Sequence, residues 1–287
     1  MHFKNYQENA MSLSNERKRF LEETCLGLRR DLIKLLYGIQ TGHPGGSLSS
    51  TEIMTTLYFD KLRVDPKNPK DPNRDRFILG KGHAAPMLYM ILAARGFFPQ
   101  DDLVTLRQLD SHLQGHPCAK KTCGVELSTG PLGLGLPAGL GMAMAARLDG
   151  LDYRTVVLMG DGELQEGIVW EAAMSASKFA ADNLLVIVDN NGVQLDGTVS
   201  EIMPMGDIGA KWRAFGWNVI EIDGHCVEAI ADAVDLAATV KGVPTVIVAR
   251  TVKGKGVSFM EGKSAWHGKP IGKDEYVNAM KELGVTA

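Results

Sequence analysis

The sequence predicts an α/β fold, in which a doubly wound, mostly parallel sheet is flanked by helices and preceded by a helical N-terminal region. Short apolar runs alternate with helical stretches from residue 155 onward, which is typical of strands joined by crossover helices. Amphipathic segments dominate before residue 96. Glycine is also enriched, at 32 of 287 residues, against a usual share of about 7%. Glycine-rich backbone at strand ends is common around bound phosphates.

The first third is expected to be helical. Three segments carry apolar residues at helical spacing: 15–37, 51–59 and 85–95. The first stops before Gly38 and the third closes at Gly96, as helices commonly do at glycine. Three prolines punctuate residues 65–75, which predicts a surface loop. Residues 1–20 are interpreted as an N-terminal extension.

Four buried strands are expected downstream, at residues 155–159, 184–188, 217–222 and 245–249. Helices at 170–179 and 227–240 lie between them, the pattern of a parallel sheet with right-handed crossovers. The N-terminal region would cover this sheet and feed one edge. Residues 271–287 are expected to form a C-terminal helix (273–283) and tail, so that residues 1–287 make one domain. Ligands bind beyond the carboxyl ends of such strands, here after Met159 and Val188.

Composition excludes several classes of function. The net charge is −3, without a basic tail, which argues against nucleic-acid binding. The most apolar stretch, 132–146, contains four glycines and one proline and is too short to span a bilayer. The four cysteines form no CxxC pair, so neither a disulfide framework nor a structural zinc is expected. We therefore expect a cytoplasmic protein that does not bind membranes.

Polar residues follow two neighbouring strands. Gly160-Asp161-Gly162-Glu163 comes after the first strand, and Asp189-Asn190-Asn191-Gly192-Val193 ends the second. Asp161 and Asn191 are 30 residues apart, a suitable length for one crossover. Oxygen ligands beside a glycine-rich helix start suit Mg²⁺ bridging a diphosphate. A simpler interpretation, in which Asp161 caps a helix and Asn191 sits in a turn, is equally compatible with these residues.

Further motifs extend this pattern, and with them the sequence resembles the transketolases from about Gly42 to Pro270. Besides the GDG…NN spacing typical of thiamine-diphosphate enzymes, the motifs are TGHPGG (41–46), DRFILGKGHA (75–84), GHP (115–117), TGPLG (129–133), GDGELQEG (160–167), and TVKGKG (251–256) followed by WHG (266–268). They occur in the order found in that family.

The resemblance implies thiamine diphosphate and Mg²⁺, for which Ca²⁺ or Mn²⁺ can substitute, as cofactors. Asp161, Asn191 and the Val193 carbonyl match the family's metal ligands. The remaining cofactor contacts match Gly46, His83, Gly130, Pro131, Leu132, Gly162, Asn191, Lys253 and His267. Some relatives have serine at the position of Gly46, and many have glutamine at that of Leu134, which leaves substrate preference open.

Four histidines match catalytic positions of the family: His43, His83, His116 and His267. Imidazoles suit ketol transfer because they can stabilise an alkoxide and mediate proton transfer from a neighbouring hydroxyl. Glu166 and Glu171 match interface carboxylates that connect two active sites, whereas Glu163 is interpreted as pairing with a helix dipole. His2, His112 and His225 are interpreted as surface or turn residues.

The resemblance covers only the first of three transketolase domains. We expect a split enzyme, in which a second subunit supplies the pyrimidine-binding and C-terminal domains, in preference to a truncated chain. Two copies of each subunit would form a heterotetramer that transfers a two-carbon ketol unit between sugar phosphates. The site would lie between the two kinds of domain, so the surface around residues 160–170 is expected to be an apolar interface.

Alternatives remain open at this point. One is a split enzyme for a branched or unusual sugar phosphate. Another keeps the cofactor but changes the reaction, as in deoxyxylulose-phosphate synthase or a 2-oxo-acid decarboxylating component. A third is a regulatory module that binds Mg²⁺ and phosphate through the Asp161 loop without turnover. His43, His116 and residues 266–268 favour a polyol donor, and hence transketolase.

Overall fold

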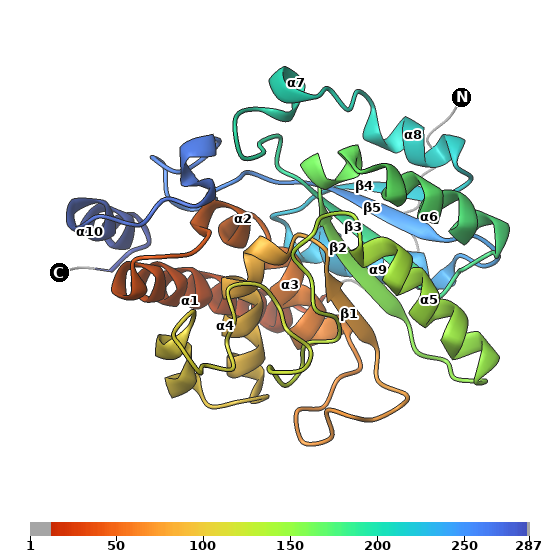
Figure 1. Ribbon diagram of the computed structural model, residues 1–287, viewed down its shortest axis with the longest axis horizontal. Coiled ribbons are helices and arrows are strands. Elements are labelled where there is room, and N and C mark those ends of the chain that lie inside the picture. Colours follow the sequence, from red (N-terminus) through yellow and green to blue (C-terminus); the bar gives the residue numbers. More distant parts are fainter. Residues whose placement is uncertain (1–12, 286–287) are drawn as a thin grey trace.

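Five parallel strands form one sheet in the computed structural model, which describes residues 13–285 (Figure 1). The order is β1-β2-β3-β5-β4. The strands are β1 (Arg76–Leu79), β2 (Thr155–Gly160), β3 (Leu184–Asn190), β4 (Asn218–Asp223) and β5 (Thr245–Arg250). Because every pair is parallel, all carboxyl ends lie at one edge of the sheet.

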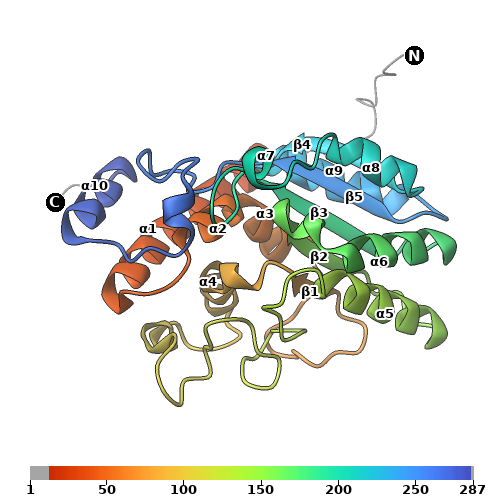
Figure 2. The same ribbon diagram turned by 45° about the horizontal axis from the view of Figure 1, so that its top comes forward.

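Helices cover both faces of the sheet. One face packs against α1 (Asn15–Ile39), α3 (Thr51–Thr56), α4 (Ala85–Arg95) and α9 (Val227–Thr239). The other packs against α5 (Gly135–Leu148), α6 (Gly167–Lys178) and α8 (Ile208–Ala214). Shorter helices are α2 (Pro44–Ser49) and α7 (Val199–Ile202). The last helix, α10 (Lys273–Glu282), packs on α1, away from α5 and α6 (Figures 1 and 2).

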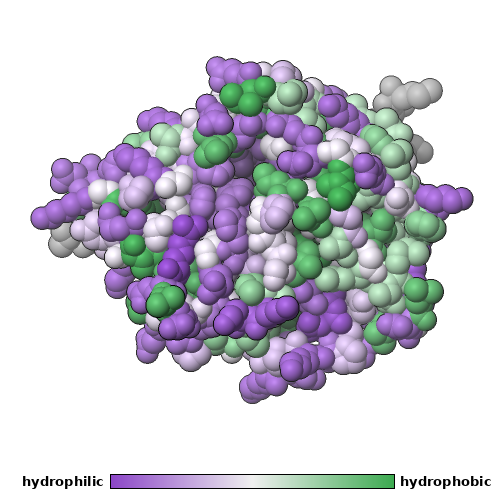
Figure 3. All heavy atoms as spheres, viewed as in Figure 1, coloured by the Kyte–Doolittle hydropathy of each residue, from purple (hydrophilic) through white to green (hydrophobic). Residues whose placement is uncertain are grey.

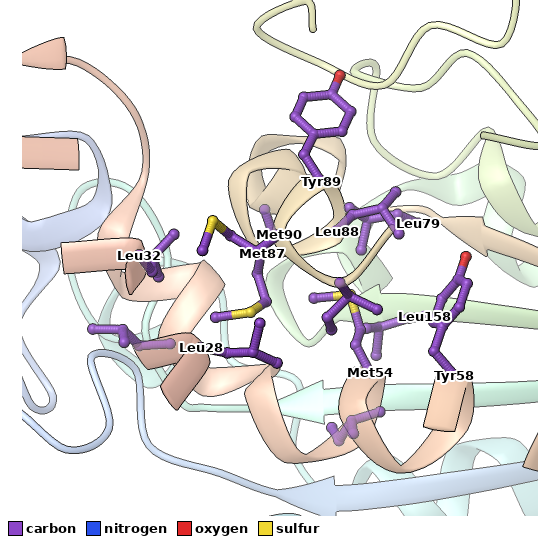
Figure 4. Close-up of a cluster of buried hydrophobic side chains, with 14 of the residues drawn as sticks. Leu28, Leu32, Met54, Tyr58, Leu79, Met87, Leu88, Tyr89, Met90 and Leu158 are labelled. Atoms are coloured by element: carbon purple, nitrogen blue, oxygen red, sulfur yellow. The ribbon is translucent and has the colours of Figure 1, made fainter. Parts of the chain in front are cut away.

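The two helical layers follow from the alternation of side chains along a strand. In β2, Val156 and Leu158 point to the α1–α4 layer, whereas Val157 and Met159 point to the α5–α6 layer. All four are fully buried, so the strand is apolar throughout rather than alternating. Figure 4 shows Leu158 meeting Met54 and other side chains of α1, α3 and α4 in the larger cluster.

Most of the expected elements are confirmed. Helix α1 begins after Ser14, whose side chain accepts the backbone N–H of Arg17, and α4 ends at Gly96, which has a φ of 88°. Both features are standard helix caps. The parallel sheet is also confirmed, and the N-terminal region does feed one edge of it through β1. Residues 1–12 of the expected extension, with His2, and residues 286–287 of the tail lie outside the described residues.

Three expectations were wrong in detail. The sheet has five strands, because β1 is only four residues long and begins with a charged residue, which hides it among the motifs. Strand β4 is not buried but half exposed, since it forms the edge beyond β5. The helix expected at 51–59 changes after Thr56 into a π-helical turn, Leu57–Lys61. None of the helices among residues 13–285 is both long and apolar enough to cross a membrane.

Candidate active site

The predicted metal ligands meet at the carboxyl ends of β2 and β3. Asp161 is buried, and its two carboxylate oxygens accept the N–H groups of Gly162 (2.8 Å) and Gly192 (2.6 Å). The Asn191 Oδ1 accepts the N–H of Val193 at 3.1 Å. Asp161 and Asn191 thus do make the local bonds of a cap and a turn, and the same bonds orient their oxygens.

This oxygen set fits a divalent cation. Burial, aided by the nearby Asp189, raises the pKa of Asp161 to about 6, because ionisation leaves a second negative charge in a region of low dielectric. A bound cation would relieve that cost. Each Asp161 oxygen accepts one N–H and retains lone-pair capacity. Carboxylate, amide and carbonyl oxygens are the donors that Mg²⁺ prefers, so Asp161, Asn191 and Val193 could hold it.

Gly162, the next residue, lies in a short 3₁₀ helix, Gly162–Gln165, and α6 begins only at Gly167. A Cβ at Gly162 would approach the Cβ of Gln194 to 3.3 Å. The backbone at residue 162 can therefore approach a diphosphate closely.

Glu163 is not the dipole-pairing residue that was expected. Its side chain is buried beside the end of β1, and it accepts the N–H groups of Gly133 (2.9 Å) and Gly160 (3.1 Å). Burial raises the pKa of Glu163 to about 7. Glu163 is therefore an internal anchor between the 129–133 loop and the GDG loop. By contrast, Glu166 and Glu171 are exposed in this chain, and their role at an interface stays a prediction.

Four histidines from separate segments converge at this edge. His43 precedes α2, His83 follows β1, His116 lies in a loop, and His267 ends a 3₁₀ helix, Ser264–His267. The ring centroid of His43 lies 5.6 Å from that of His83, 6.2 Å from His116 and 5.3 Å from His267. His83 and His267 are 4.7 Å apart. The structure thus brings together all four predicted catalytic histidines.

These imidazoles are held neutral. Burial lowers the pKa of His43 to about 4 and that of His267 to about 3, and it holds the pKa of His83 well below the usual value. His116 is more exposed, and burial lowers its pKa to a lesser extent. Neighbouring cations add to the effect in each case. Neutral imidazoles can both donate and accept a hydrogen bond, as proton transfer between sugar hydroxyls requires.

Lys253 connects the histidines to the metal ligands. Its Nζ is buried, 2.9 Å from the Nδ1 of His267, and it donates to the Val193 carbonyl at 3.1 Å. Burial, together with the charge of Lys81, lowers the pKa of Lys253 to about 8. A buried ammonium with a lowered pKa is stabilised by an anion. Lys253 could therefore pair with a diphosphate.

Close backbone approaches shape the remaining cofactor contacts. A Cβ at Gly46 would lie 3.0 Å from the His83 Nε2, and one at Gly82 would lie 2.9 Å from the N atom of Gly130. The Oγ1 of Thr129 is buried with no hydrogen-bond partner, an unmet polar group that a ligand could satisfy. Pro131 and Leu132, next in the chain, are exposed. The 129–132 backbone could thus line a cofactor.

Two histidines outside the cluster have defined contacts. His112 lies 3.1 Å from Asp102 at the surface, as expected. His225 does lie in a turn, but it is not a simple surface residue. Its Nδ1 is 2.9 Å from the carboxylate of Glu52, and its Nε2 accepts the N–H of Val252 at 2.8 Å. Since Nε2 accepts, the ring proton lies on Nδ1 and faces Glu52.

Sequence reasoning missed two groups of functional interest. Lys81 and Asp189 form a fully buried ion pair beneath the site, and Arg107 contacts His43. Lys81 and Asp189 occur in the quoted motifs, directly after or at the end of a strand, and that position was the available signal. Arg107 lies in a loop outside the quoted motifs, so no comparable signal existed for it.

Known proteins share this architecture and these motifs. The family described as transketolase, thiamine diphosphate binding domain, matches residues 28–287. One of the two subunits of an apulose-4-phosphate transketolase from Phocaeicola vulgatus is 42% identical over 89% of this chain and 90% of its own length. The 6-deoxy-6-sulfo-D-fructose transketolase subunit SqwG of a Clostridium species is 40% identical over 94% and 98%, respectively.

Solved structures agree with these sequence relatives. The transketolase from Campylobacter jejuni superposes with a TM-score of 0.87 at 34% identity, over 93% of this chain. This chain spans only 43% of that protein, whereas it spans nearly the full length of the two relatives described before it. The resemblance inferred from the motifs is therefore confirmed: the chain belongs to the transketolase family, of which it carries the thiamine-diphosphate-binding domain.

Proposed function

We propose that this chain is the diphosphate-binding subunit of a two-chain transketolase, which moves a two-carbon ketol unit from a ketose phosphate to an aldose phosphate. The observation that carries the proposal is the convergence of four neutral histidines with the Asp161, Asn191 and Val193 oxygens at one edge of the sheet. Bound thiamine diphosphate would supply the electron sink for carbon–carbon bond cleavage.

In this proposal the chain holds the cofactor through three kinds of group. Asp161, Asn191 and the Val193 carbonyl bind Mg²⁺, which Ca²⁺ or Mn²⁺ can replace. Lys253 and the backbone of Gly162 face the diphosphate, with Asn191 and His267 beside it. Gly46, His83 and the backbone of residues 130–132 complete the contacts. The buried charge on Lys253 and the unpaired Thr129 hydroxyl support this assignment.

The histidines act on the sugar. A neutral imidazole can donate a hydrogen bond to the oxygen on which negative charge develops, and a second can accept the proton of the neighbouring hydroxyl. His43, His83, His116 and His267 are assigned these roles jointly. Their lowered pKa values keep them neutral at physiological pH. The chemistry then needs no prior deprotonation of an imidazolium.

A second subunit is proposed to complete the site. Large apolar side chains are exposed beside the cofactor loops, including Leu132, Leu134 and Met174, and hydrophobic residues gather over α5 and α6 (Figure 3). Exposed apolar surface of this kind is typical of protein interfaces. Relatives of nearly equal length are named as transketolase subunits. We expect a heterotetramer of two copies of each chain, with Glu166 and Glu171 at the interface.

The sugar itself is less defined. Relatives named for apulose-4-phosphate and for 6-deoxy-6-sulfo-D-fructose favour a specialised sugar substrate over a general pentose phosphate as a second candidate. Deoxyxylulose-phosphate synthase and 2-oxo-acid decarboxylation are not favoured, since the similar proteins are named as transketolases. A cytoplasmic location stays a prediction.

The test is to tag the chain in its native cells, purify it gently and identify bound species by native mass spectrometry. Equal amounts of a second chain, with thiamine diphosphate and Mg²⁺, would support the proposal. The purified assembly would then be assayed with ketose phosphates, with aldose acceptors and with pyruvate. Ketol transfer is expected. Pyruvate consumption, or a chain that binds neither cofactor nor partner, would overturn the proposal.

A further inference from the structure

Arg107 is held beside the histidine cluster in an unusual backbone conformation. Its φ is 64°, in the left-handed region that residues other than glycine seldom adopt. The Arg107 N–H donates to the Leu113 carbonyl at 2.9 Å, and the hydroxyls of Thr105 and Ser111 are 2.7 Å apart. These bonds close the loop and direct the Arg107 side chain inward. Uncommon backbone angles of this kind concentrate at functional sites.

The guanidinium then reaches the segments that carry two of the histidines. Nη1 donates to the Thr41 Oγ1 at 3.0 Å, and Nη2 lies 3.4 Å from both the His43 Nδ1 and the Gly115 carbonyl. Gly115 leaves the room required, because a Cβ there would come within 3.2 Å of the Arg107 Nε. The Arg107 side chain therefore joins the His43 segment to the His116 segment.

These contacts determine which nitrogen of His43 carries the proton. A guanidinium has only donors and stays charged at all relevant pH values. The Nδ1 that faces it must accept, so the proton of the neutral ring lies on Nε2. We propose that Arg107 is a positioning residue, which locks His43 as a neutral Nε2–H donor toward the substrate oxygen.

Other groups around His43 reinforce this state. The charges that act on it come from Arg107, His116 and Lys253, and the rings of His83 and His267 also face it. No carboxylate is among these neighbours in the part of the chain that the structure describes. Every such neighbour is neutral or positive, so none favours an imidazolium or the opposite tautomer.

The consequence for the reaction rests on the proposed function. A locked Nε2–H donor can stabilise negative charge on a sugar oxygen without first releasing a proton. Loss of Arg107 frees the ring to populate both tautomers and to protonate more readily. The rate of the chemical step should then fall more than substrate binding does.

The lock can be tested in the full-length chain without any activity assay. The chain is labelled with ¹⁵N-histidine, and the ring nitrogens are followed by NMR between pH 4.5 and 8, with a His43→Gln variant for assignment. In the wild type, the His43 Nδ1 should be unprotonated, Nε2 protonated, and the ring neutral down to about pH 5. Arg107→Gln should mix the tautomers and move the titration midpoint upward by about one pH unit.

Two further variants separate a specific lock from a general loss of structure. Arg107→Lys retains the charge but not the fork, and should recover the low midpoint better than the tautomer. Arg95→Gln removes a guanidinium that lies over Phe59 and should leave the His43 signals unchanged. A wild-type His43 protonated on Nδ1, or an Arg107→Gln spectrum identical to that of the wild type, would overturn the proposal.

The assembled enzyme provides a second readout. For ketol transfer, Arg107→Gln is expected to lower kcat about 10- to 100-fold with KM changed less than threefold, and to shift the acidic limb of the pH profile upward. Equal loss in kcat at every pH would contradict the lock. Because the NMR result requires neither partner nor sugar, failure of the proposed function would leave it standing as a measured tautomer.

Discussion

The ammonium of Lys81 and the carboxylate of Asp189 form a fully buried ion pair that joins the ends of β1 and β3. Lys81 also donates to the Gly46 carbonyl at 2.9 Å. The same Asp189 carboxylate accepts from Ser49 in α2, from Thr251 after β5 and from the Asn191 amide. One ion pair thus connects the segments that carry His43, Asn191 and Lys253, so the site is organised from beneath.

Replacing Asp189 by Asn should destabilise the chain by about 3 to 5 kcal/mol, because it leaves the Lys81 ammonium buried without its counter-charge. Urea unfolding at pH 7 measures the change. The matched control is Arg250→Gln, which breaks an ion pair with Glu221 at an exposed position and should cost less than about 1 kcal/mol. Equal losses in the two variants would contradict a buried-charge origin.

Glu163→Ala should lower the free energy of unfolding by about 2 to 4 kcal/mol. It removes the acceptor of two buried N–H groups, those of Gly133 and Gly160, and each unsatisfied group costs about 1 to 3 kcal/mol. Glu171→Ala, on the exposed surface of α6, is the control and should change stability by less than about 0.5 kcal/mol. Thermal unfolding that shows the same midpoint for both variants would refute the anchor role.

Gly254→Ala should be strongly destabilising, by about 2 kcal/mol or more. Gly254 has a φ of 81°, and a Cβ there would come within 2.6 Å of the Met260 carbonyl oxygen, which belongs to the backbone and cannot rotate away. Gly27→Ala is the opposite case. Gly27 lies within α1 with open space around it, so alanine should stabilise by about 0.5 to 1 kcal/mol. Denaturant midpoints that moved in the same direction would argue against this assignment.

Asp161→Ala should weaken Mg²⁺-dependent binding of thiamine diphosphate by at least about 100-fold, since even supporting residues around a metal contribute 10- to 100-fold. Titration calorimetry on the assembled enzyme measures the affinity. Asp149→Asn, in an exposed turn after α5, serves as the control and should bind normally. Wild-type affinity in Asp161→Ala would show that the metal is held elsewhere.

Acid should destabilise the folded chain partly through His43. The unfolded ring takes up a proton below about pH 6.5, whereas the folded ring does so only near pH 4. Between these values the unfolded state holds more protons, so stability falls as pH drops through this window. After allowance for solvent screening, we expect a loss of about 1 kcal/mol from His43 between pH 7 and 5.

Urea unfolding at both pH values, on the wild type and on His43→Gln, isolates that contribution. The variant should lose about 1 kcal/mol less stability than the wild type over the same interval. Identical pH dependence in the two proteins would mean that His43 titrates alike in the folded and unfolded states.

Local sequence signals determined much of this protein. Apolar runs with helical segments between them predicted the parallel sheet, since a strand buried on both faces reads as a continuous hydrophobic run. The motif residues predicted the edge at which Asp161, Asn191 and the four histidines meet. Strand β1 was missed because four residues starting with Arg76 carry too little periodicity.

Only the tertiary structure decided how the individual polar groups behave. Glu163 looks like an ordinary acid in the first turn of a helix, yet the 129–133 loop folds over it and buries it. Lys81 and Asp189 are 108 residues apart in the chain, and Arg107 is 64 residues from His43, so no local pattern pairs them. Burial and charge proximity set protonation states, and both arise only when distant segments pack together.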